Sequence, residues 1–248
     1  MKNWQIYPLN LGQGFRDKSF MVYRKDPGVR IESAFLAFLL VSGEEKILVD
    51  TGPPEVERMA PFHKPYTQSS EQTMEVQLAR LHTRPEEIRT VINTHLHWDH
   101  CYRNDLFPHA SFYVQKRELE YARNPLCLHL EAYETRQKGF VPPYEGIDFH
   151  TVDGDADFRP GIKLVLSPGH TLGIQTVCVQ TREGLYLIAG DTIPLYANLD
   201  VPEGEIPIPN ALHVDLREYV ETLEKLMRLG GRILPGHERK VLEKTEYP

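Results

Sequence analysis

The chain has 248 residues, and its 41 % hydrophobic and 25 % charged residues are typical of a globular protein with a substantial apolar core. Its formal net charge of −7 argues against a nucleic-acid partner, because nucleic-acid binders display basic patches. The first residues lack the apolar core of a signal peptide and no segment is as long and apolar as a membrane span, so we expect a cytoplasmic protein without a membrane partner.

Apolar stretches rich in β-branched and aromatic side chains predict strands. In chain order they cover 5–11, 34–41, 46–50, 91–94, 111–115, 162–166, 174–180, 185–189 and 232–234. Helices are expected over 71–82, 116–123 and 215–229, and the last of these has apolar residues at i, i+3 and i+4 spacing. Each half of the chain runs from strands through polar turns to a helix. This order predicts an α/β fold in which two sheets pack face to face with helices outside, a four-layer αββα sandwich formed by one domain over 1–248.

The segment His95-Leu96-His97-Trp98-Asp99-His100 directly follows the strand expected over 91–94. Its three imidazoles and one carboxylate are groups that Zn²⁺ binds readily. The i, i+2 spacing of His95 and His97 lets both rings converge on one ion, whereas Asp99 and His100 face differently. A tetrahedral site uses about four ligands, so further ligands elsewhere in the chain would indicate a second ion.

Such ligands follow three later strands. Pro168-Gly169-His170, Gly190-Asp191 and Pro235-Gly236-His237 each place a His or Asp after a Gly, which permits the tight turn that aims a side chain across the end of a sheet. Any one of these sequences alone usually forms just a turn and does not indicate a metal ligand. Together they predict one metal site, assembled from strand ends, with seven candidate ligands: His95, His97, Asp99, His100, His170, Asp191 and His237.

The cysteines Cys101, Cys127 and Cys178 cannot all pair with one another, and in a reducing cytoplasm they need not pair. Cys101 follows His100, and a thiolate there could bind zinc. We expect that it does not, because the seven candidates already fill two sites.

The ligand pattern resembles the metallo-β-lactamase superfamily of dinuclear hydrolases, in order, over residues of about 33 to 240. The turn Leu48-Val49-Asp50-Thr51-Gly52 is similar to an early motif of that family. The resemblance implies one ion on His95, His97 and His170, a second ion on Asp99, His100 and His237, and Asp191 as the bridge. It also implies that Asp50 steadies the ligand loop, although Asp-Thr-Gly after a strand is common in turns as well.

Two divalent ions would form a hydrolytic centre. We expect Zn²⁺, with iron, manganese or cobalt as alternatives that the sequence does not separate. Water shared by two ions has its pKa lowered from nearly 16 to about 7, so a metal-bridging hydroxide would attack a carbonyl or phosphoryl centre. Asp191 or Asp99 could then carry the proton to the leaving group.

Within the superfamily the chain resembles the N-acyl homoserine lactonases, the quorum-quenching branch. The resemblance rests on Trp98 before Asp99, on Asn104 and Phe107, and on the stretch 114–122. It implies that the enzyme opens lactone rings, most often those of N-acyl homoserine lactones. Many of these lactonases place a tyrosine three residues after the bridging Asp, where this chain has Pro194. Tyr196 could act as the catalytic tyrosine only if the loop is rebuilt.

Three Pro-rich segments over 53–70, 124–147 and 193–213 carry apolar and aromatic side chains. They predict walls for a small-molecule substrate with an apolar acyl part, or else they pack as satellite clusters. The oligomeric state stays open, with a homodimer as one possibility.

Other functions remain as alternatives. The first is a metal-dependent hydrolase of another ester, thioester or lactone. A β-lactamase is normally exported, a thioesterase of the glyoxalase II type needs a basic carboxy-terminal extension, and a nuclease needs a basic surface. A diiron redox protein would carry Glu in place of His97, and a complete ligand set argues against a non-catalytic metal-binding protein.

Overall fold

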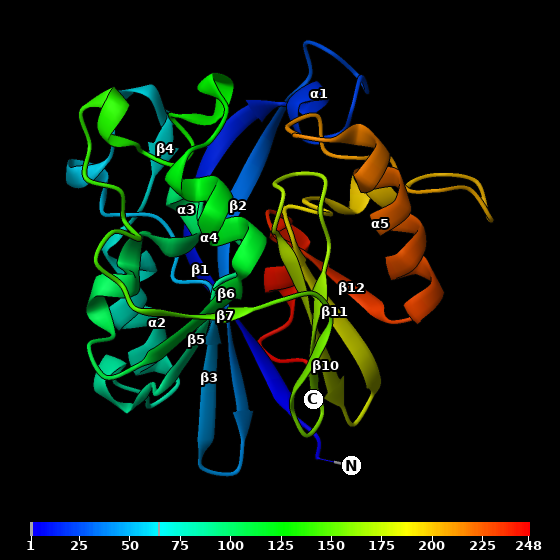
Figure 1. The fold of residues 1–248 in the computed structure, drawn as a ribbon. Coiled ribbons are helices and arrows are strands. Elements are labelled where there is room, and N and C mark those ends of the chain that lie inside the picture. Colours follow the sequence, from blue (N-terminus) through cyan, green and yellow to red (C-terminus); the bar gives the residue numbers. More distant parts are fainter. Residues whose placement is uncertain (1, 64) are drawn as a thin grey trace.

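The computed structural model describes residues 2–63 and 65–248, and its strands form two sheets that pack face to face (Figure 1). The first sheet has the order β4-β1-β2-β3-β5-β6-β7 and the second has the order β12-β11-β10-β9-β8. The first sheet consists of β1 (Gln5–Asp17), β2 (Arg30–Ser42), β3 (Glu45–Val49), β4 (Tyr66–Thr67), β5 (Thr90–Ile92), β6 (Ser111–Gln115) and β7 (Phe149–Val152). The second consists of β8 (Ala156–Arg159), β9 (Ile162–Leu166), β10 (Gln175–Thr181), β11 (Gly184–Gly190) and β12 (Arg232–Pro235).

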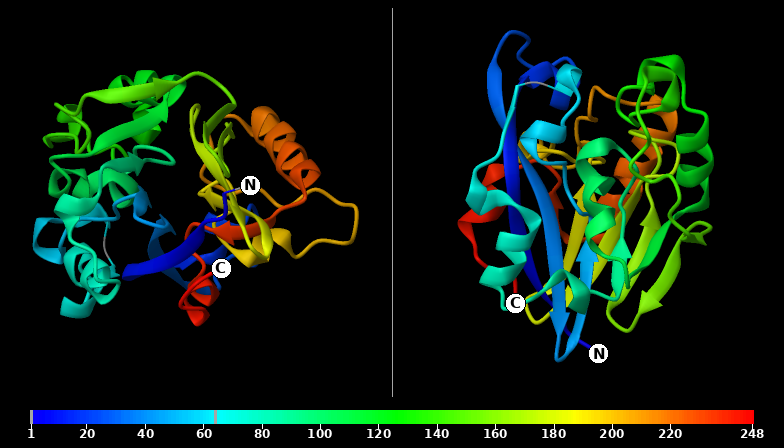
Figure 2. Two further views of the ribbon diagram at one scale, coloured as in Figure 1. Left: turned by 90° about the horizontal axis from the view of Figure 1, so that it is seen from below. Right: turned by 90° about the vertical axis from the view of Figure 1, so that its left-hand side faces the viewer.

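Five α-helices accompany these sheets within residues 2–63 and 65–248. They are α1 (Lys18–Met21), α2 (Met74–Arg80), α3 (Trp98–Cys101), α4 (Lys116–Arg123) and α5 (Leu216–Leu229). In Figure 1, α2 lies outside the first sheet and α5 lies outside the second, and Figure 2 shows the two halves of the chain side by side. None of the helices within the described ranges has the length and apolar character needed to span a membrane.

Strand β2 shows why the layers form. Its residues alternate between two faces, as in any strand, and both faces are buried. Phe38 and Leu40 join the core between the sheets, whereas Leu39 joins the cluster that packs against α2. On the other side of the molecule, Tyr219 and Leu223 of α5 pack against the second sheet. The four-layer αββα sandwich is therefore confirmed.

Most expected elements are present with shifted bounds. All nine expected strands form, and α4 has the expected bounds 116–123. The helix expected over 71–82 is split, because Thr73 interrupts it and caps α2 by accepting a hydrogen bond from Val76 N. The short strands β4, β7 and β8 were missed because two to four residues carry too little periodic signal.

The packing of α5 predicts which of its residues stabilise the fold. Replacing the fully buried Leu223 by Ala should lower the free energy of unfolding by about 2–5 kcal/mol, because it removes apolar contacts and leaves a cavity. Met227→Ala on the same helix, at a side chain that is 38 % exposed, should change it by no more than about 0.5 kcal/mol. Urea denaturation measures both, and equal losses would contradict this packing.

Candidate metal centre

Polar side chains follow five strands at one edge of the sandwich. Asp50 follows β3, the segment 95–100 follows β5, His170 follows β9, Asp191 follows β11, and His237 follows β12. All of these side chains are buried. The strand ends thus deliver imidazoles and carboxylates from distant parts of the chain to one place.

The seven candidate ligands come together. Their donor atoms form three groups in which all atoms lie within 4.8 Å of one another. The groups are His95, His97 and His170; His95, His100 and Asp191; and Asp99, His100 and His237. The first and third groups are the two sets that the family resemblance implied.

Asp191 lies between those sets. Its Oδ1 is 3.2 Å from His100 Nε2 and 2.9 Å from His237 Nε2, while its Oδ2 is 3.4 Å from His170 Nε2. One carboxylate therefore faces both sets with different oxygens, which is the geometry that a bridging ligand needs.

The donor atoms fit divalent cations. Nε2 of His95, His97 and His100 and Oδ1 of Asp191 are buried without a hydrogen-bond partner within the described residues. A buried polar atom left unsatisfied costs about 1–3 kcal/mol, and several of them around one point are suited to a cation. Burial and the neighbouring imidazoles hold the pKa of His95 and of His97 well below the usual value, so both rings are neutral with free lone pairs.

The carboxylates give the centre a preference for positive charge. Burial opposes protonation of His100, but Asp191, Asp50 and Asp99 raise its pKa well above the usual value. Burial likewise favours a protonated Asp191, but His237, His100 and His170 hold its pKa well below the usual range. The electrostatic field of these carboxylates, which favours a proton on His100, would also favour a divalent cation.

Hydrogen bonds to the other ring nitrogens orient the histidines. His100 Nδ1 lies 2.8 Å from Asp50 Oδ2, His170 Nδ1 lies 2.7 Å from Leu212 O, and His237 Nδ1 lies 2.7 Å from Ala34 O. Each bond turns Nε2 toward the centre, which is how such partners orient metal-binding imidazoles.

Asp50 occupies the supporting position that the resemblance implied. Besides His100, it accepts hydrogen bonds from Thr94 N and Thr94 Oγ1, both at 2.7 Å. Its backbone has a φ of 60°, a left-handed conformation that Asp tolerates better than most residues. The strained turn after β3 therefore places one carboxylate against both ends of the ligand loop.

Glu118 was missed in the sequence. This fully buried carboxylate on α4 accepts hydrogen bonds from Leu96 N at 3.0 Å, Tyr133 Oη at 2.8 Å and Thr171 Oγ1 at 2.5 Å. It thereby connects the ligand loop after β5 to the turn that carries His170. A carboxylate in helical register with the buried Tyr121 and Ala122 is the signal that could have revealed it.

Cys101 lies outside the three groups. Its thiol donates to Leu96 O at 3.4 Å, and burial raises its pKa well above the usual value, so it stays protonated. This placement agrees with the expectation that Cys101 is not a ligand.

Tyr196 is not among the residues that line the cavity over the ligands. It begins a short 3₁₀ helix, Tyr196–Leu199, and its half-buried side chain packs against the core between the sheets instead of lining the cavity over the ligands. Leu195, the residue before it, packs in the cluster of Met21 and Val22. The catalytic role of Tyr196 stays a prediction.

A cavity of about 110 Å³ opens over the ligands. Five of the seven ligands reach it, and its other walls are Arg16, Met21, Trp98, Leu128, His129, Ala132 and Leu212. Two of the expected wall segments, 124–147 and 193–213, contribute side chains. The described residues of 53–70 do not, and the stretch 16–21 was missed because nothing in its sequence shows that the long hairpin of β1 and β2 reaches the site.

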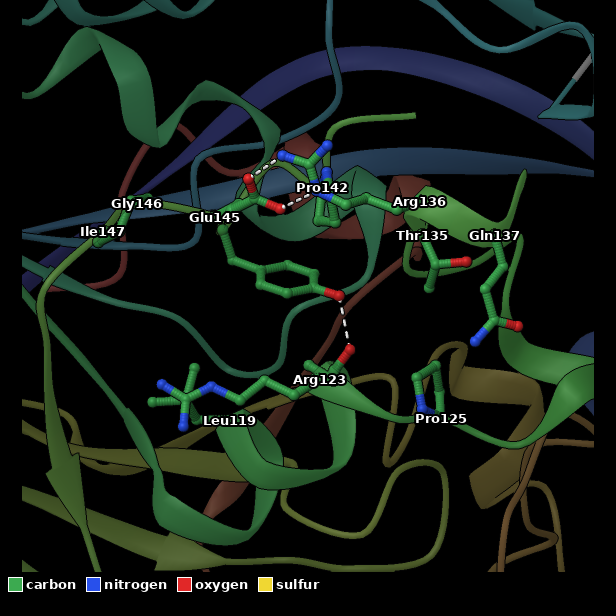
Figure 3. A pocket seen from close by; sticks show the side chains of 12 residues that line it. Leu119, Arg123, Pro125, Thr135, Arg136, Gln137, Pro142, Glu145, Gly146 and Ile147 are labelled. Atoms are coloured by element: carbon green, nitrogen blue, oxygen red, sulfur yellow. Dashed lines mark hydrogen bonds and ion pairs between the residues drawn. The ribbon is translucent and has the colours of Figure 1, made fainter. Parts of the chain in front are cut away.

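A larger cavity of about 350 Å³ lies beside α4 (Figure 3). Arg136 and Glu145 form an ion pair on its wall, and Tyr144 donates to Ala122 O at 2.6 Å. None of the seven candidate ligands lines this cavity. Cavity volume therefore does not identify the candidate functional site here. The clustered lone pairs of the buried His and Asp side chains do.

Comparison with known proteins agrees with the geometry. Residues 36–237 match the sequence model of the metallo-beta-lactamase superfamily. An N-acyl homoserine lactonase of Bacillus thuringiensis is 28 % identical over 213 residues, which cover 82 % of this chain and 80 % of the lactonase. A solved quorum-quenching N-acyl homoserine lactone lactonase covers 97 % of this chain and 94 % of its own, with a TM-score of 0.78 and 25 % identity. A solved dizinc quorum-quenching lactonase has the same fold, with a TM-score of 0.70 and 18 % identity over 96 % of this chain and 89 % of its own.

The contacts of Asp50 predict its effect on metal affinity. Asp50→Asn keeps the shape of the side chain but replaces one acceptor oxygen by a donor, so His100 loses its orienting partner. The affinity for Zn²⁺ should fall about 10–100-fold, measured by competition with a chromophoric chelator. Asp157→Asn, at an exposed position on β8, is the control, and an unchanged affinity in Asp50→Asn would refute this supporting role.

Proposed function

The chain belongs to the metallo-β-lactamase superfamily, and from that premise we propose that its single domain is a dinuclear metal-dependent hydrolase that opens the ring of N-acyl homoserine lactones. The observation that carries the proposal is the position of Asp191 between two sets of buried imidazoles and carboxylates. The similarity to N-acyl homoserine lactonases over 82 % of the chain supports the substrate class. The three free cysteines suit the reducing cytoplasm in which we propose that it acts.

Two divalent ions are proposed, one on His95, His97 and His170 and the other on Asp99, His100 and His237, with Asp191 shared. Zn²⁺ is our first choice, because imidazole nitrogen and carboxylate oxygen suit it well. Iron, manganese and cobalt accept the same donors.

When bound, such ions supply a hydroxide nucleophile near neutral pH and stabilise the charge that develops on the carbonyl oxygen. Hydrolysis then breaks the ring ester bond: the hydroxyl adds to the carbonyl carbon, and the ring oxygen leaves and takes up a proton. Asp99 lines the cavity, and its Oδ2 lies 3.7 Å from His237 Nε2. We assign Asp99 to carry that proton to the leaving oxygen.

The walls of the cavity suit an apolar acyl group. Met21, Leu128 and Leu212 line it, and Leu128 is 86 % exposed and Leu212 is 41 % exposed. These side chains continue the apolar wall from the cavity to its mouth. The small closed volume would hold the lactone ring, and the acyl chain would lie along the mouth.

A hydrolysis panel tests the proposal. The protein should hydrolyse N-acyl homoserine lactones with a higher kcat/KM than nitrocefin, a glutathione thioester or a phosphodiester. The pH drop on ring opening measures lactone turnover. A preference for any of the other substrates would contradict the proposed function.

Asp191→Asn should lower kcat/KM for the lactone by about three orders of magnitude. The reason is that the centre loses the negative charge between the two ligand sets, and with it several kcal/mol of transition-state stabilisation. The exposed Asp157→Asn should keep the wild-type value. Metal content and circular dichroism are measured on both variants. Full activity in a folded Asp191→Asn protein would exclude the dinuclear mechanism.

Removal of metal should abolish hydrolysis, and Zn²⁺ should restore it. Activity should increase until about two equivalents per chain are bound, because two sets of ligands must be filled. Titration of the chelator-treated protein measures this ratio, and parallel titrations with iron, manganese and cobalt identify the most active metal. Saturation at one equivalent would contradict two ions.

A further inference from the structure

His129 lines the cavity over the metal centre but belongs to none of the three ligand groups. It ends the short 3₁₀ helix Cys127–His129, next to Leu128 on the apolar wall. Within the described residues no protein partner is recorded for its Nε2. His129 therefore brings a polar group without a protein partner to a wall that is otherwise suited to an acyl chain.

The hydrogen bonds around His129 determine which ring nitrogen carries the proton. Tyr121 Oη lies 2.8 Å from His129 Nδ1, and Leu126 N donates to the same Oη at 3.3 Å. The backbone N–H of Leu126 occupies one lone pair of the phenol oxygen, and we assign the phenol hydrogen to the bond with His129 Nδ1. Nδ1 then accepts, so Nε2 carries the hydrogen of the neutral imidazole.

The surroundings keep both groups in these states. Burial raises the pKa of Tyr121, so the phenol retains the hydrogen that it donates. Burial lowers the pKa of His129, and His170 and His213 lower it further, so the imidazole is neutral near pH 7. The donor at Nε2 thus exists before any substrate arrives.

Helix α4 positions this donor relative to the metal centre. Glu118 of α4 connects the loops that carry His97 and His170, and Tyr121 of the same helix holds His129. Residues three apart on a helix lie on the same face. One rigid element therefore sets the distance between the ligands and His129.

We propose that His129 is a substrate-binding residue that donates its Nε2–H to the amide carbonyl oxygen of the N-acyl group, with Tyr121 as its positioning residue. This assignment rests on the proposed function. In an N-acyl homoserine lactone the amide joins the ring to the acyl chain. His129 lines the same cavity as the ligands that would face the ring and as Leu128 and Leu212, which would face the chain.

Two substrates and two variants test the assignment. N-hexanoyl homoserine lactone carries the amide and γ-butyrolactone lacks it, and turnover of both by the wild type first establishes the lactonase activity. His129→Asn removes the donor at Nε2, whereas the longer His129→Gln can place an amide N–H near that position. A wild type that turns over neither lactone would refute the proposed function itself, independently of His129.

His129→Asn should lower kcat/KM for N-hexanoyl homoserine lactone about 10–100-fold, mainly through KM, which corresponds to one lost hydrogen bond to a buried carbonyl. It should change kcat/KM for γ-butyrolactone less than about 3-fold. His129→Gln should recover part of the loss. Equal losses on both lactones, no loss on either, or loss of bound zinc from His129→Asn would each overturn the assignment.

The positioning role of Tyr121 has a spectroscopic test. In ¹⁵N-histidine NMR spectra of the zinc-loaded wild type, His129 should appear as the Nε2-protonated tautomer. Tyr121→Phe should shift His129 to a mixture of tautomers and raise KM for N-hexanoyl homoserine lactone. Tyr113→Phe, whose hydroxyl makes no hydrogen bond to the described residues, should do neither. An unchanged tautomer in Tyr121→Phe would overturn the role of Tyr121.

Discussion

Asp191 lies where the strand ends of both sheets meet, with one oxygen toward His100 and His237 and the other toward His170. Around it, several buried nitrogen lone pairs have no hydrogen-bond partner among the described residues. Burying such groups is unfavourable unless something satisfies them, and a divalent cation does so for several at once. The donor groups at this edge of the sandwich are therefore arranged around one carboxylate, Asp191, which faces both sets.

The surrounding contacts keep that arrangement rigid. Asp50 joins the turn after β3 to the loop after β5, and Glu118 joins the same loop to the turn after β9. Both carboxyl groups are buried and accept three hydrogen bonds each, so a shift of either loop would leave buried oxygens unsatisfied. Rigid support of this kind is what a centre with donor atoms from four strand ends requires.

The walls of the proposed substrate cavity come from a different part of the fold. The ligands come from strand ends, whereas the walls come from the long β1–β2 hairpin, the loop after α4 and the loop before α5. These segments bring Met21, Leu128 and Leu212 together although they are far apart in the chain. The catalytic centre and its specificity can thus change independently, because loops tolerate substitution more readily than the strands that carry the ligands.

The seven candidate ligands, the layered fold and the three principal helices could be predicted from the residues alone. Each of these has a local pattern, such as His95-x-His97 after an apolar run or the apolar spacing of α5. Such a pattern can be recognised within one segment without knowing its tertiary contacts. Three features could be found only from long-range packing. Tyr196 packs against the core between the sheets, Glu118 and Tyr121 of α4 form hydrogen bonds with Leu96 and His129, and Arg16 and His129 line the cavity. These roles depend on which long-range segments meet and on the direction of single side chains, and neither is encoded in the spacing of residues along one segment.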